Sequence, residues 1–189
     1  MAKLDVLRFP DPRLRRSSEP IEKITDELRE LAADMLGTMY DEPGIGLAAP
    51  QVGHAIRLIV MDTEWTAEGA ERNPCVFVNP VITERSGEIV WEEGCLSVPD
   101  FTAEVKRAEH VVLKALDLEG REVVETASGL RAVCFQHELD HLDGVLFIDR
   151  ISRLKRNLYV GKRKKLLQEE GERWTSSGER PPIPIGTKL

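Results

Sequence analysis

Apolar residues recur at helical spacing in three parts of the chain, which predicts three helices. The first follows Thr25, whose side chain can cap a helix. Its apolar positions repeat every three or four residues and are Leu28, Leu31, Ala32, Met35, Leu36 and Met39. A second helix is expected to begin near Ser128 and to end before Gly144. The third is expected over residues 152–170.

Strand patterns lie between these helices. Residues 54–61 alternate as a half-buried strand does, and residues 75–81 read similarly. Residues 110–118 and 121–126 flank Glu119-Gly120, which favours a hairpin turn. Short strands in the middle with helices at both ends predict a single α+β domain, with small antiparallel sheets around a central helix and a further C-terminal helix.

The end of the chain has a different composition. Beyond Trp174 it contains three prolines and two glycines, which cannot build a core element. We therefore expect one domain over residues 1–170 and a mobile or surface-hugging tail over residues 171–189.

The bulk composition is that of a globular protein, with 41% hydrophobic and 31% charged residues among 189. No apolar run approaches the roughly 20 residues that a membrane span needs, and the N-terminus lacks the apolar segment of a secretion signal. These features predict a cytoplasmic protein with no membrane partner. The odd number of cysteines (Cys75, Cys95 and Cys134) favours reduced thiols. Cys75 falls in a predicted strand and is expected in the core.

The net charge of −7 is unevenly distributed. Residues 149–165 contain eight basic residues and one acid, so this segment carries +7 and the rest of the chain carries −14. The basic residues are Arg150, Arg153, Lys155, Arg156, Lys162, Arg163, Lys164 and Lys165. Such asymmetry is typical of a docking surface for a polyanion, and equally of a solvated helix face that complements an acidic body. Both interpretations stay open.

The most informative chemical pattern is His137-Glu138-Leu139-Asp140-His141, in the central predicted helix. Residues four apart share a helix face, so both imidazoles can reach one metal ion. Glu138 lies about 100° around the helix from His137, close enough to act on a metal-bound water without ligating the metal. Two surface histidines would be the simpler explanation. The apolar run before His137, however, predicts a buried helix in which imidazoles need partners.

A catalytic metal site needs a third protein ligand and an open position for water. Cys134 lies on the same face, but a rise of about 10.5 Å separates residues 134 and 141 along the helix. It is better explained as a small apolar residue beside the site. Cys95 follows Gly94, which lets the backbone approach another element, and precedes Pro99, which should end any strand. Spacing alone leaves Cys95 neither favoured nor excluded as the third ligand.

Three separated blocks of the sequence carry a family resemblance. They are Gly44-Ile45-Gly46-Leu47-Ala48-Ala49-Pro50-Gln51, Glu93-Gly94-Cys95-Leu96-Ser97 and Gln136-His137-Glu138-Leu139-Asp140-His141. In residues and order they resemble the blocks of the peptide deformylases, metallohydrolases that remove the formyl group from N-terminal formyl-methionine of nascent bacterial proteins. The resemblance extends over about residues 7–165, and the three blocks together are highly specific.

The resemblance implies a ligand set. Cys95, His137 and His141 would bind one divalent metal ion, usually Fe²⁺ in the cell, with Zn²⁺, Ni²⁺ or Co²⁺ possible in isolated protein. The domain over residues 1–170 would then be a deformylase-like catalytic domain built around the metal-binding central helix.

Catalytic roles follow from the same resemblance. A metal-bound water would attack the formyl carbon and release formate, with Glu138 as general base and then acid. The Gln51 side chain and the Leu96 backbone N–H would stabilise the oxyanion. Gly46 belongs to the same catalytic group.

The resemblance also implies how a formyl-methionyl peptide binds. Bare backbone in the first block would pair with the peptide as with a β-strand. Apolar residues one or two turns before His137 would line a pocket for the methionine side chain, a role compatible with core packing. The expected substrate-binding residues are Ile45, Gly46, Glu93, Gly94, Leu130, Val133 and Cys134.

Some bacterial members of the family dock their C-terminal helix on the ribosome. The resemblance therefore turns the polyanion interpretation of residues 150–165 into a possible transient ribosome contact. Two features depart from the family pattern. Thr102 stands where many members carry an arginine that helps to line the cleft, and the tail runs past the shorter members.

Two alternatives make different predictions. A zinc endopeptidase would need a third ligand downstream of His141, where no histidine occurs and Asp143, Asp149 or a distant glutamate would have to serve. An inactive protein that only binds N-terminal peptides would have lost a ligand or the base, yet all of these residues are present.

Overall fold

Helices and short strands alternate along residues 2–65 and 71–177, which the computed structural model describes, with side chains through residue 171. With η denoting a short 3-10 helix, the elements are η1 (Pro12–Arg15), α1 (Asp26–Asp41), β1 (Gly46–Ala48), η2 (Ala49–Val52), β2 (Leu58–Met61), β3 (Cys75–Ser86), β4 (Ile89–Cys95), β5 (Val98–Arg107), β6 (His110–Leu116), β7 (Glu122–Ser128), α2 (Gly129–Leu142), η3 (Phe147–Asp149) and α3 (Arg153–Ser177).

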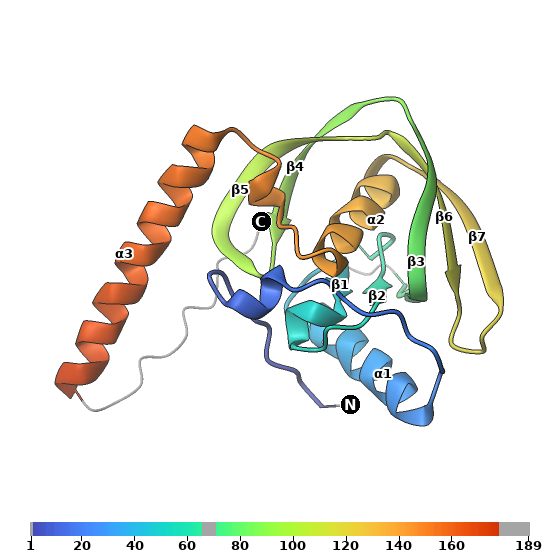
Figure 1. Cartoon of the computed structure of the whole chain (residues 1–189), viewed down its shortest axis with the longest axis horizontal. Coiled ribbons are helices and arrows are strands. Elements are labelled where there is room, and N and C mark those ends of the chain that lie inside the picture. The colour runs from blue at the N-terminus through green and yellow to red at the C-terminus, as the bar shows by residue number, and fades with distance from the viewer. Residues whose placement is uncertain (1, 66–70, 178–189) are drawn as a thin grey trace.

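The strands form two antiparallel sheets. The larger has the order β1-β2-β3-β6-β7, and the smaller consists of β4 and β5. β1 lies at the edge of the larger sheet and pairs with β2, where Gly46 is opposite Met61. Figure 1 shows the strands curving around α2, with α1 below them and α3 set apart as a long C-terminal helix. The predicted α+β fold with a central helix is confirmed.

Apolar packing buries α2. Its residues Ala132, Phe135, Leu139 and Leu142 share one core cluster with residues of the larger sheet. Phe135 meets Phe77 of β3 edge to face, with 5.1 Å between ring centroids. Because the helix is enclosed, the polar side chains on it must find partners inside the protein.

Two local sequence signals form as predicted. Thr25 accepts a hydrogen bond from the backbone N–H of Leu28 (3.3 Å) at the start of α1. The strands β6 and β7 pair as a hairpin whose turn contains Gly120 at a φ of 79°, a conformation that glycine adopts freely. In both places a few neighbouring residues determine the structure.

Two strand predictions were wrong in detail. Of residues 54–61, only Leu58–Met61 form a strand, and all four are buried because α1 packs on one face of β2 and α2 on the other. Pro99 was expected to end any strand but lies inside β5. The β4–β5 register shifts between Glu93 and Cys95, and this irregular stretch tolerates a residue without an N–H.

The last helix is longer than predicted. α3 continues to Ser177, so the boundary expected after residue 170 falls inside it. The residues after Gly171 contain no proline before Pro181, which lets the helix continue. The rest of the expected tail, residues 178–189, lies outside the described residues. Across the described part of the chain, no helix combines the length and apolar character that crossing a bilayer requires.

Candidate metal centre

Three potential ligand atoms meet where β4 ends against α2. Cys95 is the last residue of β4, while His137 and His141 lie about one turn apart on α2. The Cys95 Sγ is 3.2 Å from the His141 Nε2, and the ligand atoms of the three residues lie within 4.8 Å of one another. Among the described residues, no other trio of His, Cys, Asp or Glu is gathered in this way. The geometry therefore favours Cys95 over the other cysteines.

The other two cysteines lie outside this cluster. Cys134 is buried beside it, as expected of a small apolar neighbour. Cys75 is only half-buried, not in the core as expected, because it opens β3 at the end of the sheet. There the Arg131 guanidinium approaches its Sγ at 3.5 Å.

A buried ion pair orients His137. The His137 Nδ1 lies 2.7 Å from a carboxylate oxygen of Glu93, and Arg107 donates two hydrogen bonds to the same carboxylate (2.6 and 2.9 Å). Burial would raise the pKa of Glu93, but the hydrogen bonds from Arg107 and His137 outweigh it and lower the pKa to about 2. An ionised Glu93 keeps the proton of His137 on Nδ1, which leaves Nε2 available as a ligand atom.

His141 is buried and uncharged. Burial lowers the pKa of His141 well below its usual value, because a charged imidazole is unfavourable away from water. Its Nδ1 is buried and makes no hydrogen bond to any described residue. A neutral imidazole with Nε2 directed at a thiol is the form that binds a metal ion.

Glu138 lies against the cluster at the bottom of a buried site. Its side chain is buried, and no described residue hydrogen-bonds to its Oε2. Burial raises the pKa of Glu138 to about 7. A carboxylate that titrates near neutrality can both accept and return a proton.

Gly46 makes room for this carboxylate. A Cβ at Gly46 would lie 2.4 Å from the Glu138 Oε1 and 2.9 Å from the Cys134 Sγ. Any larger residue at this position would have to push Glu138 aside. The glycine is therefore required by close packing, in addition to any role of its backbone.

Gln51 directs an amide toward the cluster. Its Oε1 accepts the backbone N–H of Ala48 (2.8 Å), which fixes the orientation of the amide. Its Nε2 then faces the Cys95 Sγ (3.6 Å) and the Ser97 Oγ (3.2 Å). η2 carries Gln51, and the turn between β4 and β5 carries Leu96, so both expected oxyanion donors lie next to Cys95.

A cleft of about 1580 Å³ opens onto these groups. It runs past the edge of β1 and β4–β5, between the N-terminal segment and α3. All the predicted site residues except His141 border it; that residue lies deeper. The lining includes Ile45, Gly46, Gln51, Glu93, Gly94, Cys95, Leu96, Leu130, Val133, Cys134, His137 and Glu138.

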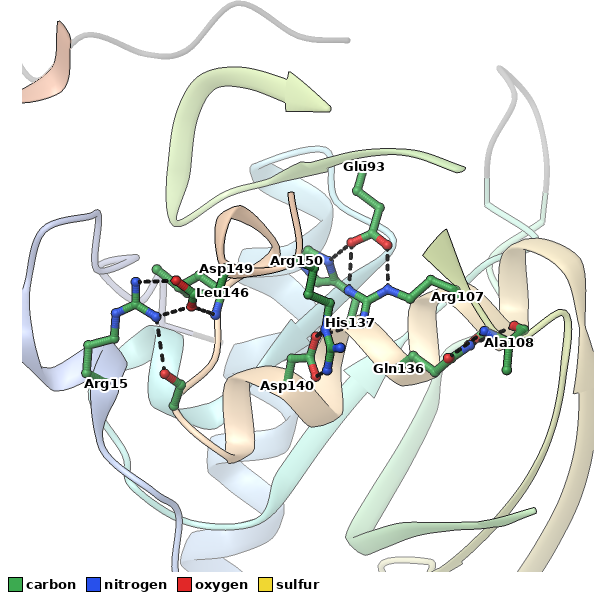
Figure 2. Close-up of polar contacts among 12 residues, drawn as sticks. Arg15, Glu93, Arg107, Ala108, Gln136, His137, Asp140, Leu146, Asp149 and Arg150 are labelled. Atoms are coloured by element: carbon green, nitrogen blue, oxygen red, sulfur yellow. Dashed lines mark hydrogen bonds and ion pairs between the residues drawn. The ribbon is translucent and has the colours of Figure 1, made fainter. Parts of the chain in front are cut away.

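The structure adds residues that the sequence analysis missed. Arg107 holds the carboxylate of Glu93, which also contacts His137 (Figure 2), while Glu93 keeps its predicted place at the cleft. Asp140 is also buried and accepts hydrogen bonds from Arg107 and Arg150. An acidic side chain inside a buried helix needs a cationic partner. Asp140 in the motif could therefore have indicated that arginines lie near it.

Comparison with known proteins identifies the family. The family model for polypeptide deformylase matches residues 3–157. The chain belongs to this family. It is 52% identical over 169 residues to a peptide deformylase of Alkalilimnicola ehrlichii, covering 89% of this chain and 93% of the relative. It is 51% identical to one of Rhizobium meliloti, covering 86% and 93%.

Solved structures agree. A peptide deformylase from Legionella pneumophila is similar at a TM-score of 0.82 with 44% identity, covering 90% of this chain and 98% of that one. The family consists of metal-dependent enzymes that remove N-terminal formyl groups during protein synthesis. The chain is therefore a hydrolase of the peptide deformylase family, and the two alternatives of peptidase and inactive binder lose their support.

Proposed function

We propose that the chain hydrolyses the formyl group from N-terminal formyl-methionine of nascent polypeptides, using one divalent metal ion bound by Cys95, His137 and His141. The observation that carries this proposal is the convergence of these three ligand atoms within 4.8 Å, next to a buried carboxylate and at a peptide-sized cleft. Such a substrate places the reaction in the cytoplasm.

The donor set fits a metal ion. A thiol and two imidazole nitrogens leave the fourth position of a tetrahedral site open, as a hydrolytic centre needs. When bound, the metal ion supplies Lewis-acid activation of water and of the formyl carbonyl. Fe²⁺ is the proposed ion in the cell, and Zn²⁺, Ni²⁺ or Co²⁺ are suited to the same donors in isolated protein.

Glu138 moves the proton in this mechanism. It takes a proton from the attacking water as the new C–O bond forms at the formyl carbon. It then gives that proton to the amine nitrogen of methionine as the C–N bond breaks, and formate leaves. The Gln51 Nε2 and the Leu96 backbone N–H donate to the formyl oxygen while it carries negative charge.

The substrate-binding roles follow the cleft. Ile45, just before the edge strand β1, offers backbone to an extended peptide together with Gly46, which begins that strand, and Gly94. Leu130, Val133 and Cys134 form the apolar side that would receive methionine. The carboxylate of Glu93 is engaged with His137, so we assign the substrate contact of this residue to its backbone. Residues 1–170 are the proposed catalytic unit.

Replacing Cys95 by serine tests the ligand set. A hydroxyl is a poor substitute for a thiolate, so metal binding should weaken by more than the roughly 10–100-fold that loss of an outer partner costs. Protein purified without oxygen would be analysed for metal and assayed on a formyl-methionyl peptide. The control is Cys75→Ser, which removes a thiol outside the cluster.

Metal content unchanged in Cys95→Ser would show that the ligand assignment is wrong. The same assay should include the unformylated peptide. Cleavage of an internal bond in that peptide would contradict the proposed reaction and favour a peptidase.

A transient ribosome contact through α3 is part of the proposal. Four cations of the basic segment, Arg153, Lys155, Lys162 and Lys164, are exposed and form no ion pair with other described residues. In ribosome co-sedimentation, the logarithm of the binding constant falls linearly with the logarithm of the salt concentration. Changing Lys162 and Lys164 to glutamine should make this slope less steep by roughly two. The paired control changes the exposed Lys23 and Lys114. Absence of binding at low salt would remove this contact.

A further inference from the structure

A chain of charged side chains connects the protein surface with the proposed metal ligand His137 (Figure 2). At the surface, Arg150 donates to both oxygens of Asp140, each at 2.5 Å. Asp140 also accepts a hydrogen bond from Arg107 at 2.7 Å. Arg107 in turn holds Glu93, which is 2.7 Å from the His137 Nδ1. Each contact shares a residue with the next.

The exposure of these side chains changes sharply along the chain of contacts. Arg107 and Glu93 are 2% and 3% exposed, Asp140 is 11% exposed, and Arg150 is 43% exposed. Two arginines and two carboxylates make the group neutral. Without Arg150, one buried guanidinium would have to serve two buried carboxylates, and an unneutralised buried charge is strongly unfavourable.

That imbalance would act on His137. Arg107 directs Nε and Nη2 to Glu93 and only Nη1 to Asp140. When Arg150 neutralises Asp140, Arg107 can keep both hydrogen bonds to Glu93. When Arg150 is absent, Asp140 competes for Arg107, and the Glu93 carboxylate that orients the His137 ring loses its support.

We infer that Arg150 is a positioning residue for the metal centre, which acts on His137 through Asp140, Arg107 and Glu93. The inference rests on the proposed role of His137 as a metal ligand. It also separates Arg150, whose guanidinium is used within the protein, from the four exposed cations of α3 that form no ion pair with other described residues, Arg153, Lys155, Lys162 and Lys164.

Arg150 acts from outside the substrate cleft. It borders a second cavity of about 380 Å³, together with Arg85, Gln136, Asp140 and Asp143, and is not among the residues that line the cleft. Replacing it should therefore leave peptide binding intact. A change in metal binding without a change in KM distinguishes this role from substrate recognition.

The test is Arg150→Gln, with Arg57→Gln as the matched control. Arg57 forms an ion pair with Asp143 (2.8 Å) at the same end of α2, but this pair does not lead to Glu93. Each protein is loaded with Co²⁺ and mixed with excess chelator, and the visible absorption of Co²⁺ follows its release. Arg150→Gln should release Co²⁺ about 10-fold faster than wild type, with unchanged KM for a formyl-methionyl peptide. Arg57→Gln should behave as wild type.

Two further measurements exclude a general loss of structure. The metal-free Arg150→Gln and Arg57→Gln proteins should unfold at similar temperatures, and Arg150→Lys should recover part of the slow Co²⁺ release. Release at the wild-type rate, equal acceleration in both glutamine variants, or a raised KM alone would each overturn the inference. Wild-type protein that takes up no Co²⁺ at this site would overturn the proposed function itself, and the inference with it.

Discussion

Replacing Glu138 by glutamine should lower deformylation by roughly 10²–10⁴-fold, the usual contribution of a general acid–base residue, while metal content stays at the wild-type level. Glutamine has nearly the same shape but cannot take a proton from water. The Glu138 carboxylate is buried, and burial raises its pKa to about 7, so it suits proton transfer near neutral pH. The measurements are kcat on a formyl-methionyl peptide and metal per chain on the same sample.

The control is Glu84→Gln, which makes the same change at an exposed position of β3. It should keep wild-type turnover. Near-normal deformylation by Glu138→Gln would show that another group moves the proton. Loss of metal together with activity would instead mean that Glu138 helps to hold the site together.

Replacing Gly46 by alanine should lower kcat by roughly 100-fold, because about 1 Å of displacement of a catalytic group has an effect of this size. The new Cβ would lie 2.4 Å from the Glu138 Oε1 and 2.9 Å from the Cys134 Sγ, so the carboxylate must move. The three heavy atoms nearest to this Cβ belong to Glu138 and Cys134 and not to a proposed metal ligand, so metal content should not change.

Gly161→Ala is the matched control. Gly161 lies in α3, where a Cβ added to it would meet nothing within 4 Å, and alanine favours a helix over glycine by about 1 kcal/mol. That variant should keep its activity and be no less stable. If Gly46→Ala turned over normally, the close packing against Glu138 would have no catalytic consequence.

The sequence by itself predicted features that depend on neighbouring residues. Thr25 and the apolar spacing after it define α1, Glu119-Gly120 defines the β6–β7 turn, and the His-Glu-Leu-Asp-His pattern places two imidazoles on one helix face. Each depends on backbone geometry within a few residues, so short patterns suffice. The resemblance of three sequence blocks then indicated the family correctly.

Only the tertiary structure decided contacts between distant segments. Cys95 meets His141 across 46 residues, and residue spacing alone could not choose it over the other cysteines. The fold also engaged the Glu93 carboxylate with His137, and it brought Arg107 and Arg150 together at Asp140. Charged side chains of α2 find partners on strands that are distant in sequence, and no local sequence pattern encodes such pairing. The helix motif predicted a metal site, whereas the fold determined which side chains complete it.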